Sequence, residues 1–223
     1  MTRIKAVFID FYGTLVYEDG EVIKAITKEI FDTGIAESTS EIAAYWWERF
    51  QKAFRNAYHD TFQTQRELEY QSLADTIEHF KSTADAKKLS DKMFQYWVNP
   101  PIFDEAKQFV EMCPVPLYIV SNIDRADILE AINFHGLKPN AVFTSEDAKS
   151  YKPRKELFEL ALKKAGLKAN EVVHIGDSRD SDVYGADSVG IHSIWVNRSG
   201  RNVPEGVVAV SNLIQVYDTS FFR

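Results

Sequence analysis

Short apolar runs recur along the chain, and each has the length of a buried β-strand. They are Ile4–Ile9, Pro116–Val120, Ala141–Phe143, Val172–Ile175 and Ile191–Val196. Runs of this length, rich in valine and isoleucine, are typical of strands that are covered on both faces. The pattern therefore predicts a buried parallel sheet.

Segments with helical spacing separate these runs, because apolar residues recur there at intervals of three and four positions. Strands that alternate with helices of 10–15 residues form βαβ units, so we predict a doubly wound α/β domain. Gly136 and Gly166 stand where two of the helices should end. The predicted helices are Asp104–Met112, Arg125–Phe134, Lys155–Ala165 and Asp180–Val189.

The stretch 17–98 differs from the rest, because it has no proline and only two glycines, Gly20 and Gly34. Without these breaks it indicates one helix after another. Asn99-Pro100-Pro101 ends the stretch and is typical of a domain junction. We predict a Rossmann-like core of residues 1–16 and 99–223, interrupted by a smaller all-helical cap domain of residues 17–98.

Aromatic side chains recur every four residues within this insert, at Trp46, Phe50, Phe54 and Tyr58. Such a row is typical of the buried stripe of a helix. Trp47 lies about 100° around the helix from Trp46, which makes it a candidate to face the cleft between cap and core.

Polar side chains follow four of the apolar runs, directly where each predicted strand ends. Ligands of an open parallel sheet lie beyond the carboxyl ends of its strands, so we expect these side chains to meet at one edge. They are Asp10 and Thr14 after the first run, Ser121 and Asn122 after the second, Lys152 after the third, and Asp177 and Asp182 after the fourth.

The chemistry of this set points to an anionic substrate and a cation. A carboxylate such as Asp10 is a competent nucleophile towards a phosphoryl group or an activated carbon. Asp10, Asp177 and Asp182 would repel one another unless a cation lay among them, and magnesium (Mg²⁺) prefers oxygen ligands of this kind. Lys152 supplies a point charge for the remaining oxygens of an anion.

The four motifs, in this order along the chain, resemble those of the haloacid dehalogenase-like hydrolase superfamily, with the insert placed as its first-type cap. The resemblance implies that Asp10 is the nucleophile and forms a covalent aspartyl intermediate. With it we expect three groups of site residues: catalytic Asp10, Tyr12 and Lys152; substrate-binding Thr14, Ser121 and Asn122; and the Mg²⁺ ligands Asp10, Tyr12, Asp177 and Asp182.

Two motifs point to different branches of this superfamily. Most of its phosphatases carry a second Asp where Tyr12 stands, and Asp-x-Tyr-Gly-Thr resembles the 2-haloacid dehalogenases, whose halide leaves without a proton. Those dehalogenases typically have Ser and Asn where Asp177 and Arg179 stand, and they need no metal. A further carboxylate in an anion site is hard to explain without a cation, so we give the fourth motif more weight.

The expected function is therefore that of a Mg²⁺-dependent phosphatase of a small phosphorylated metabolite. A metal-independent 2-haloacid dehalogenase is the first alternative. A low-turnover protein that binds a phosphate ligand is the second.

Composition and net charge narrow the classes of molecule with which the protein could interact. The 223 residues are 45% hydrophobic, which is typical of a globular protein. The formal net charge of −7 disfavours nucleic acid as a partner. No apolar run approaches the ~20 residues that span a bilayer, and the single Cys113 excludes an intrachain disulfide. We expect a cytoplasmic protein with a small-molecule substrate and no membrane partner.

Some charged residues near the strand ends have two interpretations. Arg179 is equally suited to contact a substrate or to lie on the surface. Arg198 and Arg201 form a mildly basic loop whose default is a solvated surface, with a rim contact to an anionic substrate as the minority option. His174, inside a predicted buried strand, is interpreted as a core histidine.

Overall fold

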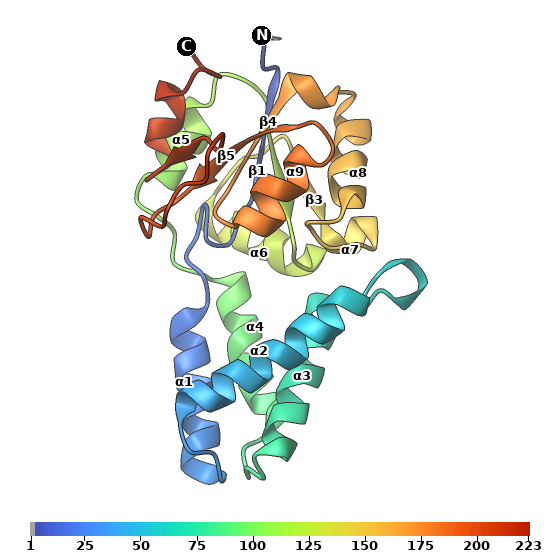
Figure 1. The fold of residues 1–223 in the computed structure, drawn as a ribbon, viewed down its shortest axis with the longest axis vertical. Helices are drawn as coiled ribbons and strands as arrows, with labels where there is room; N and C mark the ends of the chain where they lie inside the picture. Colours follow the sequence, from blue (N-terminus) through green and yellow to red (C-terminus); the bar gives the residue numbers. More distant parts are fainter. Residues whose placement is uncertain (1–2) are drawn as a thin grey trace.

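The structure, a computed structural model, describes residues 3–223, so the first two residues of the predicted core lie outside the described range. Its centre is a six-stranded sheet in which every pairing is parallel. The strands stand in the order β3-β2-β1-β4-β5-β6 (Figure 1). Their bounds are β1 Ala6–Ile9, β2 Leu117–Ser121, β3 Ala141–Thr144, β4 Val172–Gly176, β5 His192–Val196 and β6 Ala209–Val210.

The sheet is covered on both faces because side chains alternate along each strand. Val7 and Ile9 of β1 belong to the core that includes Phe109 of α5 (Ala106–Met112) and Ile128 of α6 (Arg125–His135). Phe8 instead packs with residues of α8 (Lys155–Ala165) and α9 (Gly185–Asp187). The predicted fold class, a doubly wound α/β core with a helical insert, is confirmed.

The strand order places the candidate chemistry at the point where the winding reverses. From β1 the chain first builds outward through β2 and β3, and then returns to add β4, β5 and β6 on the other side. The carboxyl ends of β1 and β4 therefore lie side by side at a topological switch point, which is where open α/β sheets bind ligands. Asp10 follows β1 and Asp177 follows β4.

The sequence predictions hold for the long elements and fail in two places. Gly136 and Gly166 end α6 and α8 in the left-handed conformation, with φ of 67° and 68°. The segment predicted as a helix over Asp180–Val189 is helical only to Asp187 and is not one α-helix: a π-helical turn, Arg179–Tyr184, leads into the short α9. There Ser178 caps the turn by accepting a hydrogen bond from the Ser181 N–H. The edge strand β6 is only two residues long and carries no periodic signal.

Four helices occupy the insert and lie together on the opposite side of the strand ends from the sheet (Figure 1). Polar side chains cap the first turns of three of them: Ser38 accepts from the Glu41 N–H, Thr64 and Glu67 form a capping box, and Asp85 accepts from the Lys88 N–H. The helices are α1 Gly20–Thr33, α2 Thr39–Asn56, α3 Gln65–His79 and α4 Ala86–Val98. That the insert forms a domain of its own stays a prediction.

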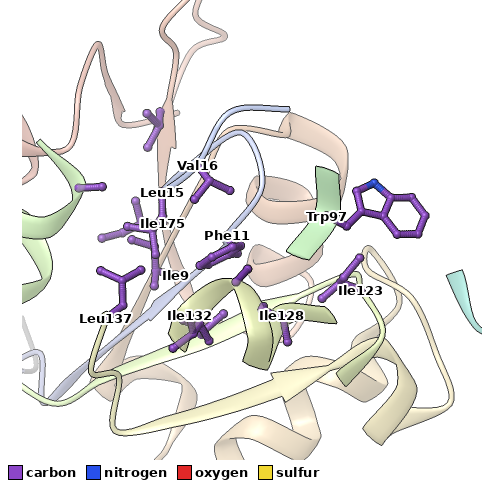
Figure 2. Close-up of a cluster of buried hydrophobic side chains, with 14 of the residues drawn as sticks. Ile9, Phe11, Leu15, Val16, Trp97, Ile123, Ile128, Ile132, Leu137 and Ile175 are labelled. Atoms are coloured by element: carbon purple, nitrogen blue, oxygen red, sulfur yellow. The ribbon is translucent and has the colours of Figure 1, made fainter. Parts of the chain in front are cut away.

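The insert contacts the core in two places, where the chain enters and leaves the insert and at the start of α3. Where the chain enters and leaves, the Tyr17 N–H donates to the Pro101 carbonyl at 2.9 Å, and the hydrophobic cluster runs from the sheet to Trp97 of α4 (Figure 2). At the start of α3, Asp124 of the core accepts hydrogen bonds from two backbone N–H groups, those of Gln65 and Arg66. These contacts hold the helices over the carboxyl edge of the sheet.

The aromatic row of α2 is only partly buried. Trp46 is buried, and its indole N–H donates to Ser72 Oγ at 3.2 Å. Trp47 is 63% exposed and stacks on Phe50 with 6.1 Å between ring centroids. That Trp47 faces the cleft between cap and core stays a prediction. Within residues 3–223, no helix is both long and apolar enough to cross a bilayer.

A substitution in the cap tests whether residues 17–98 unfold as a separate unit. Leu73 of α3 is fully buried, so Leu73→Ala should lower the stability of its unit by about 2–5 kcal/mol. In hydrogen exchange followed by mass spectrometry, peptides from α1–α4 should exchange faster, while those from β1 and β4 keep their protection. Equal loss of protection in cap and core would contradict the division.

Candidate active site

A buried lysine joins two of the predicted carboxylates. Lys152 is 2% exposed, and its Nζ lies 2.8 Å from Asp10 Oδ1 and 2.6 Å from Asp182 Oδ1. A third hydrogen bond from the same nitrogen reaches the Val120 carbonyl at 2.8 Å. Burial would lower the pKa of Lys152, but the two carboxylates outweigh this effect and raise it, so the lysine stays charged.

Asp182 is held from several directions. Besides Lys152, the Nε2 of His174 lies 3.0 Å from Asp182 Oδ1, and the Ser178 N–H donates to Oδ2 at 3.0 Å. Burial alone would raise the pKa of Asp182, but Lys152 and the hydrogen bond from His174 hold it well below its usual range. Asp182 is thus an ionised partner that orients Lys152.

The residues after β2 support this lysine in different ways. The Asn122 side chain accepts from the Lys152 N–H at 2.7 Å and donates to the Lys152 carbonyl at 3.0 Å. Asn122 therefore positions Lys152, and its predicted contact with substrate stays a prediction. Ser121 is buried beside Asp10, where burial raises the carboxyl pKa and both Lys152 and a hydrogen bond from Ser121 oppose the rise.

The carboxylate of Asp177 lies close to the turn that follows β1. Gly13 adopts a φ of 82°, and a Cβ at this position would lie 2.6 Å from the Asp177 carboxylate, so the close approach requires glycine. The Thr14 hydroxyl donates to Asp177 Oδ1 at 3.3 Å. Burial, followed by the charges of Asp182 and Asp10, raises the pKa of Asp177 to about 8.

The three carboxylates form a group that fits a divalent cation. One oxygen from each of Asp10, Asp177 and Asp182 lies within 4.8 Å of the others. Lys152 is the cation that the structure places among them, and its ion pairs reach Asp10 and Asp182 but not Asp177. An all-oxygen donor set with an excess of negative charge suits Mg²⁺.

The side chain of Tyr12 leads away from these carboxylates. Its hydroxyl donates to the Trp97 carbonyl at 2.5 Å, at the end of the cap. Burial, with nearby carboxylates, raises its pKa well above the usual value, so the phenol stays protonated. The hydroxyl is engaged at the junction of cap and core, and the role of Tyr12 as a Mg²⁺ ligand stays a prediction.

Sequence reasoning missed several residues that hold the site in place. His174 was interpreted only as a core histidine, yet it contacts Asp182. Arg198 donates to the Thr14 carbonyl at 3.0 Å and pairs with Glu105 at 2.6 Å. The buried Trp195 donates its indole N–H to the Asp177 carbonyl at 2.8 Å. A position close to the end of β5 was the available signal for Trp195 and Arg198.

A cavity of about 700 Å³ opens beside the carboxylates, between the loops after β1, β4 and β5 and the start of α1. Gly13 and Asp177 form part of its wall, so the cavity reaches the group of carboxylates at Asp177; Asp10 and Asp182 are not among its lining residues. Its lining is mostly polar: Gly13, Tyr17, Glu18, Gly20, Glu21, Phe103, Asp177, Ser178, Arg179, Asp180, Val196, Arg198, Ser199 and Arg201.

Comparisons with known proteins agree with this geometry. The mouse (Mus musculus) N-acylneuraminate-9-phosphatase is 22% identical over 218 residues, which cover 90% of this chain and 86% of that protein. The putative HAD-hydrolase YfnB from Bacillus subtilis, bound to magnesium, has a TM-score of 0.75 and 21% identity, over 97% of this chain and 98% of the other. An L-2-haloacid dehalogenase from Xanthobacter autotrophicus has a TM-score of 0.74 and 20% identity, over 96% of each chain.

The structural likenesses show the fold, and the family rests on a separate match. A family model described as haloacid dehalogenase-like hydrolase matches residues 4–190, which is most of the chain and contains all four motifs. The resemblance drawn from the sequence is thereby confirmed, and this chain belongs to the haloacid dehalogenase-like hydrolases.

Proposed function

We propose that the protein is a Mg²⁺-dependent phosphatase that acts on a small phosphorylated metabolite through an aspartyl-phosphate on Asp10. The observation that carries the proposal is the group of Asp10, Asp177 and Asp182, gathered within 4.8 Å around a single ammonium group. Lys152 balances Asp10 and Asp182, which leaves Asp177, a half-buried carboxyl, without an ion pair among residues 3–223. A divalent cation held by these carboxylates resolves the imbalance.

The residues of the chain would divide the reaction as follows. Lys152 and the Thr14 and Ser121 hydroxyls hold the oxygens of the phosphoryl group and orient it. An Asp10 oxygen attacks phosphorus, and the bond from phosphorus to the leaving oxygen breaks. Water then attacks the phosphorus of the aspartyl-phosphate, which releases inorganic phosphate and restores Asp10. When bound, Mg²⁺ neutralises charge on the phosphoryl oxygens.

The leaving group has no strong proton donor at position 12, because the Tyr12 hydroxyl is bonded to Trp97. A missing general acid slows the departure of an alkoxide but does not stop it, since such help is worth roughly 10²–10⁴-fold. We therefore infer a preference for substrates whose leaving group needs little protonation, such as acyl phosphates.

Tyr12 also supports a second candidate function, that of a metal-independent 2-haloacid dehalogenase. A halide leaves without a proton, so this reaction has no use for an acid at position 12. The chain shares the fold of such an enzyme from Xanthobacter autotrophicus. A dehalogenase would leave the half-buried Asp177 carboxyl without a role, which is why we prefer the phosphatase.

Metal dependence and the nucleophile are tested together. Phosphate release from a panel of phosphorylated metabolites and acyl phosphates should require Mg²⁺, stop in EDTA, and be lost in Asp10→Asn. Asp60→Asn, which removes an exposed carboxylate of the cap, is the matched control and should keep the wild-type rate. Halide release from a short haloacid in EDTA would support the dehalogenase instead, and phosphate binding without turnover would support the low-turnover binding protein.

Position 12 can be tested by restoring a carboxylate. Tyr12→Asp should raise kcat for alkyl phosphates by about 10-fold or more, because it supplies a general acid for a poor leaving group. Acyl phosphates should gain less. An unchanged ratio between the two substrate classes, in a variant with a wild-type circular dichroism spectrum, would contradict this account of Tyr12.

The buried charge of Asp177 predicts a pH-dependent stability. Its pKa is raised from its usual value near 4 to about 8, so without a cation its ionisation destabilises the fold progressively as pH rises between these values. In EDTA at pH 8.5, Asp177→Asn should raise the Tm above that of the wild type, whereas at pH 4 the two should be close. Mg²⁺ should raise the Tm of the wild type more than that of the variant. A lower Tm for Asp177→Asn than for the wild type in EDTA at pH 8.5 would contradict the conclusion that the Asp177 charge destabilises the fold.

A further inference from the structure

The cavity beside the carboxylates is lined by three arginines in a chain whose formal net charge is −7. Arg198 is engaged with Glu105 and the Thr14 carbonyl, and its guanidinium lies 3.6 Å from the Phe103 ring centroid. It serves to hold the loop after β1. The other two, Arg179 and Arg201, take part in no ion pair among residues 3–223.

We propose that Arg179 and Arg201 bind a second anionic group, a carboxylate or a further phosphate, on the organic part of the phosphorylated substrate. The inference rests on the proposed phosphatase function and narrows its substrate class. It assigns the reacting phosphoryl group to the Asp10 site and the remote anion to the adjoining cavity, which is lined by Asp177, Arg179 and Arg201.

Both guanidinium groups lie over a single, rigid aromatic ring. Arg201 lies 4.9 Å and Arg179 5.7 Å from the centroid of Trp195, which is fully buried and bonded through its indole to the Asp177 carbonyl. Arg201 also donates to that carbonyl at 3.2 Å. Cation–π contact of this kind restrains a guanidinium while leaving its N–H groups free for a carboxylate or phosphate. The two arginines are therefore fixed relative to the end of β4.

The acidic residues of the cavity do not neutralise this pair by direct contact. Glu21 pairs with Lys24 at 2.6 Å, and the exposed Asp180 has no ion pair within the described part of the chain. Burial raises the pKa of Glu18, with Arg201 opposing the rise, but no ion pair joins the two side chains. The N–H donors of Arg179, and those of Arg201 other than the one bonded to the Asp177 carbonyl, are thus open to an incoming anion.

The location explains why the anion would belong to the substrate. Arg179, Gly13 and Asp177 line one continuous cavity, and a volume of about 700 Å³ is large enough to enclose a small metabolite. Asp177 connects this cavity to the Asp10 site, because carboxylate oxygens of the two residues lie within 4.8 Å of each other. A ligand whose phosphoryl group lies at Asp10 would extend past Asp177 towards the arginines. Bidentate guanidinium contacts give such a remote group both affinity and orientation.

Calorimetry in Mg²⁺ with non-hydrolysable ligands tests the proposal without turnover. Propylphosphonate is compared with 3-phosphonopropionate and propane-1,3-bisphosphonate, and butylphosphonate with 4-phosphonobutyrate, so that each pair differs in the remote anion. We expect at least one doubly anionic ligand to bind the wild type about 10-fold or more tightly than its alkyl partner. The carboxylate and bisphosphonate arms show which anion the site prefers.

Arginine variants show whether the advantage arises at this site. The Arg179 side chain makes no hydrogen bond to the main chain among the described residues, so its removal should leave the backbone in place. Arg179→Gln should reduce the advantage to less than about 3-fold, and the Arg179→Gln/Arg201→Gln double variant should abolish it. Lys163→Gln removes the same charge from an exposed position on α8 and should keep the full advantage.

The outcomes separate this inference from the proposed function. Equal affinities within every pair, an advantage that survives in the double variant, or no binding of any phosphonate would overturn the inference. Mg²⁺-dependent phosphate release in the metabolite panel, combined with equal affinities, would leave the phosphatase standing and remove only the second anion site. A selective, arginine-dependent advantage in a protein that releases no phosphate would support the site and contradict the phosphatase.

Discussion

The balance of buried charge at the ends of β1 and β4 is the constraint on which the rest of the structure depends. The sheet order brings Asp10, Asp177 and Asp182 together, and burial makes each unneutralised carboxylate costly. Lys152 offsets part of that cost, and the contacts of Asn122 and His174 act through Lys152 and Asp182 to keep the ammonium in place. The remaining negative charge is the reason for our proposal that the site holds a cation and, with it, a phosphoryl group.

The loops around this centre can be understood from the same requirement. Gly13 lets the first loop pass against the Asp177 carboxylate, and Trp195 and Arg198, at and just beyond the end of β5, hold the backbone of the neighbouring loops. Tyr12 has a different place, because its hydroxyl is bonded to the end of the cap. The position that in related phosphatases would supply a proton here joins the core to the helical insert. The same substitution therefore bears on both the chemistry and the attachment of the cap.

Much of this arrangement could be predicted from the sequence, for a physical reason. Apolar runs and helical spacing indicate which residues of a strand or helix are buried, and this pattern can be seen within a short segment of sequence. A parallel sheet brings the carboxyl ends of its strands to one edge. Asp10 and Lys152 could therefore be predicted to lie close together. What the sequence could not show depends on side-chain direction. Asn122 follows a strand as a ligand would, yet turns to the backbone of Lys152, and His174 contacts Asp182 because both occupy the same face of the β4 end. Periodicity also does not report the π-helical turn at Arg179–Tyr184, whose first residues are capped by Ser178.

The central claim is that Asp10 is phosphorylated in a site that the carboxylates make dependent on Mg²⁺. Its most direct test is peptide mass spectrometry of the protein quenched in acid after brief incubation with acetyl phosphate. The account predicts a mass increase of one phosphoryl group, confined to the peptide that contains Asp10, present with Mg²⁺ and absent in EDTA. A phosphoryl group on another residue, or labelling of Asp10 that is equally strong in EDTA, would contradict it, as would no labelling in a protein that releases halide from a haloacid.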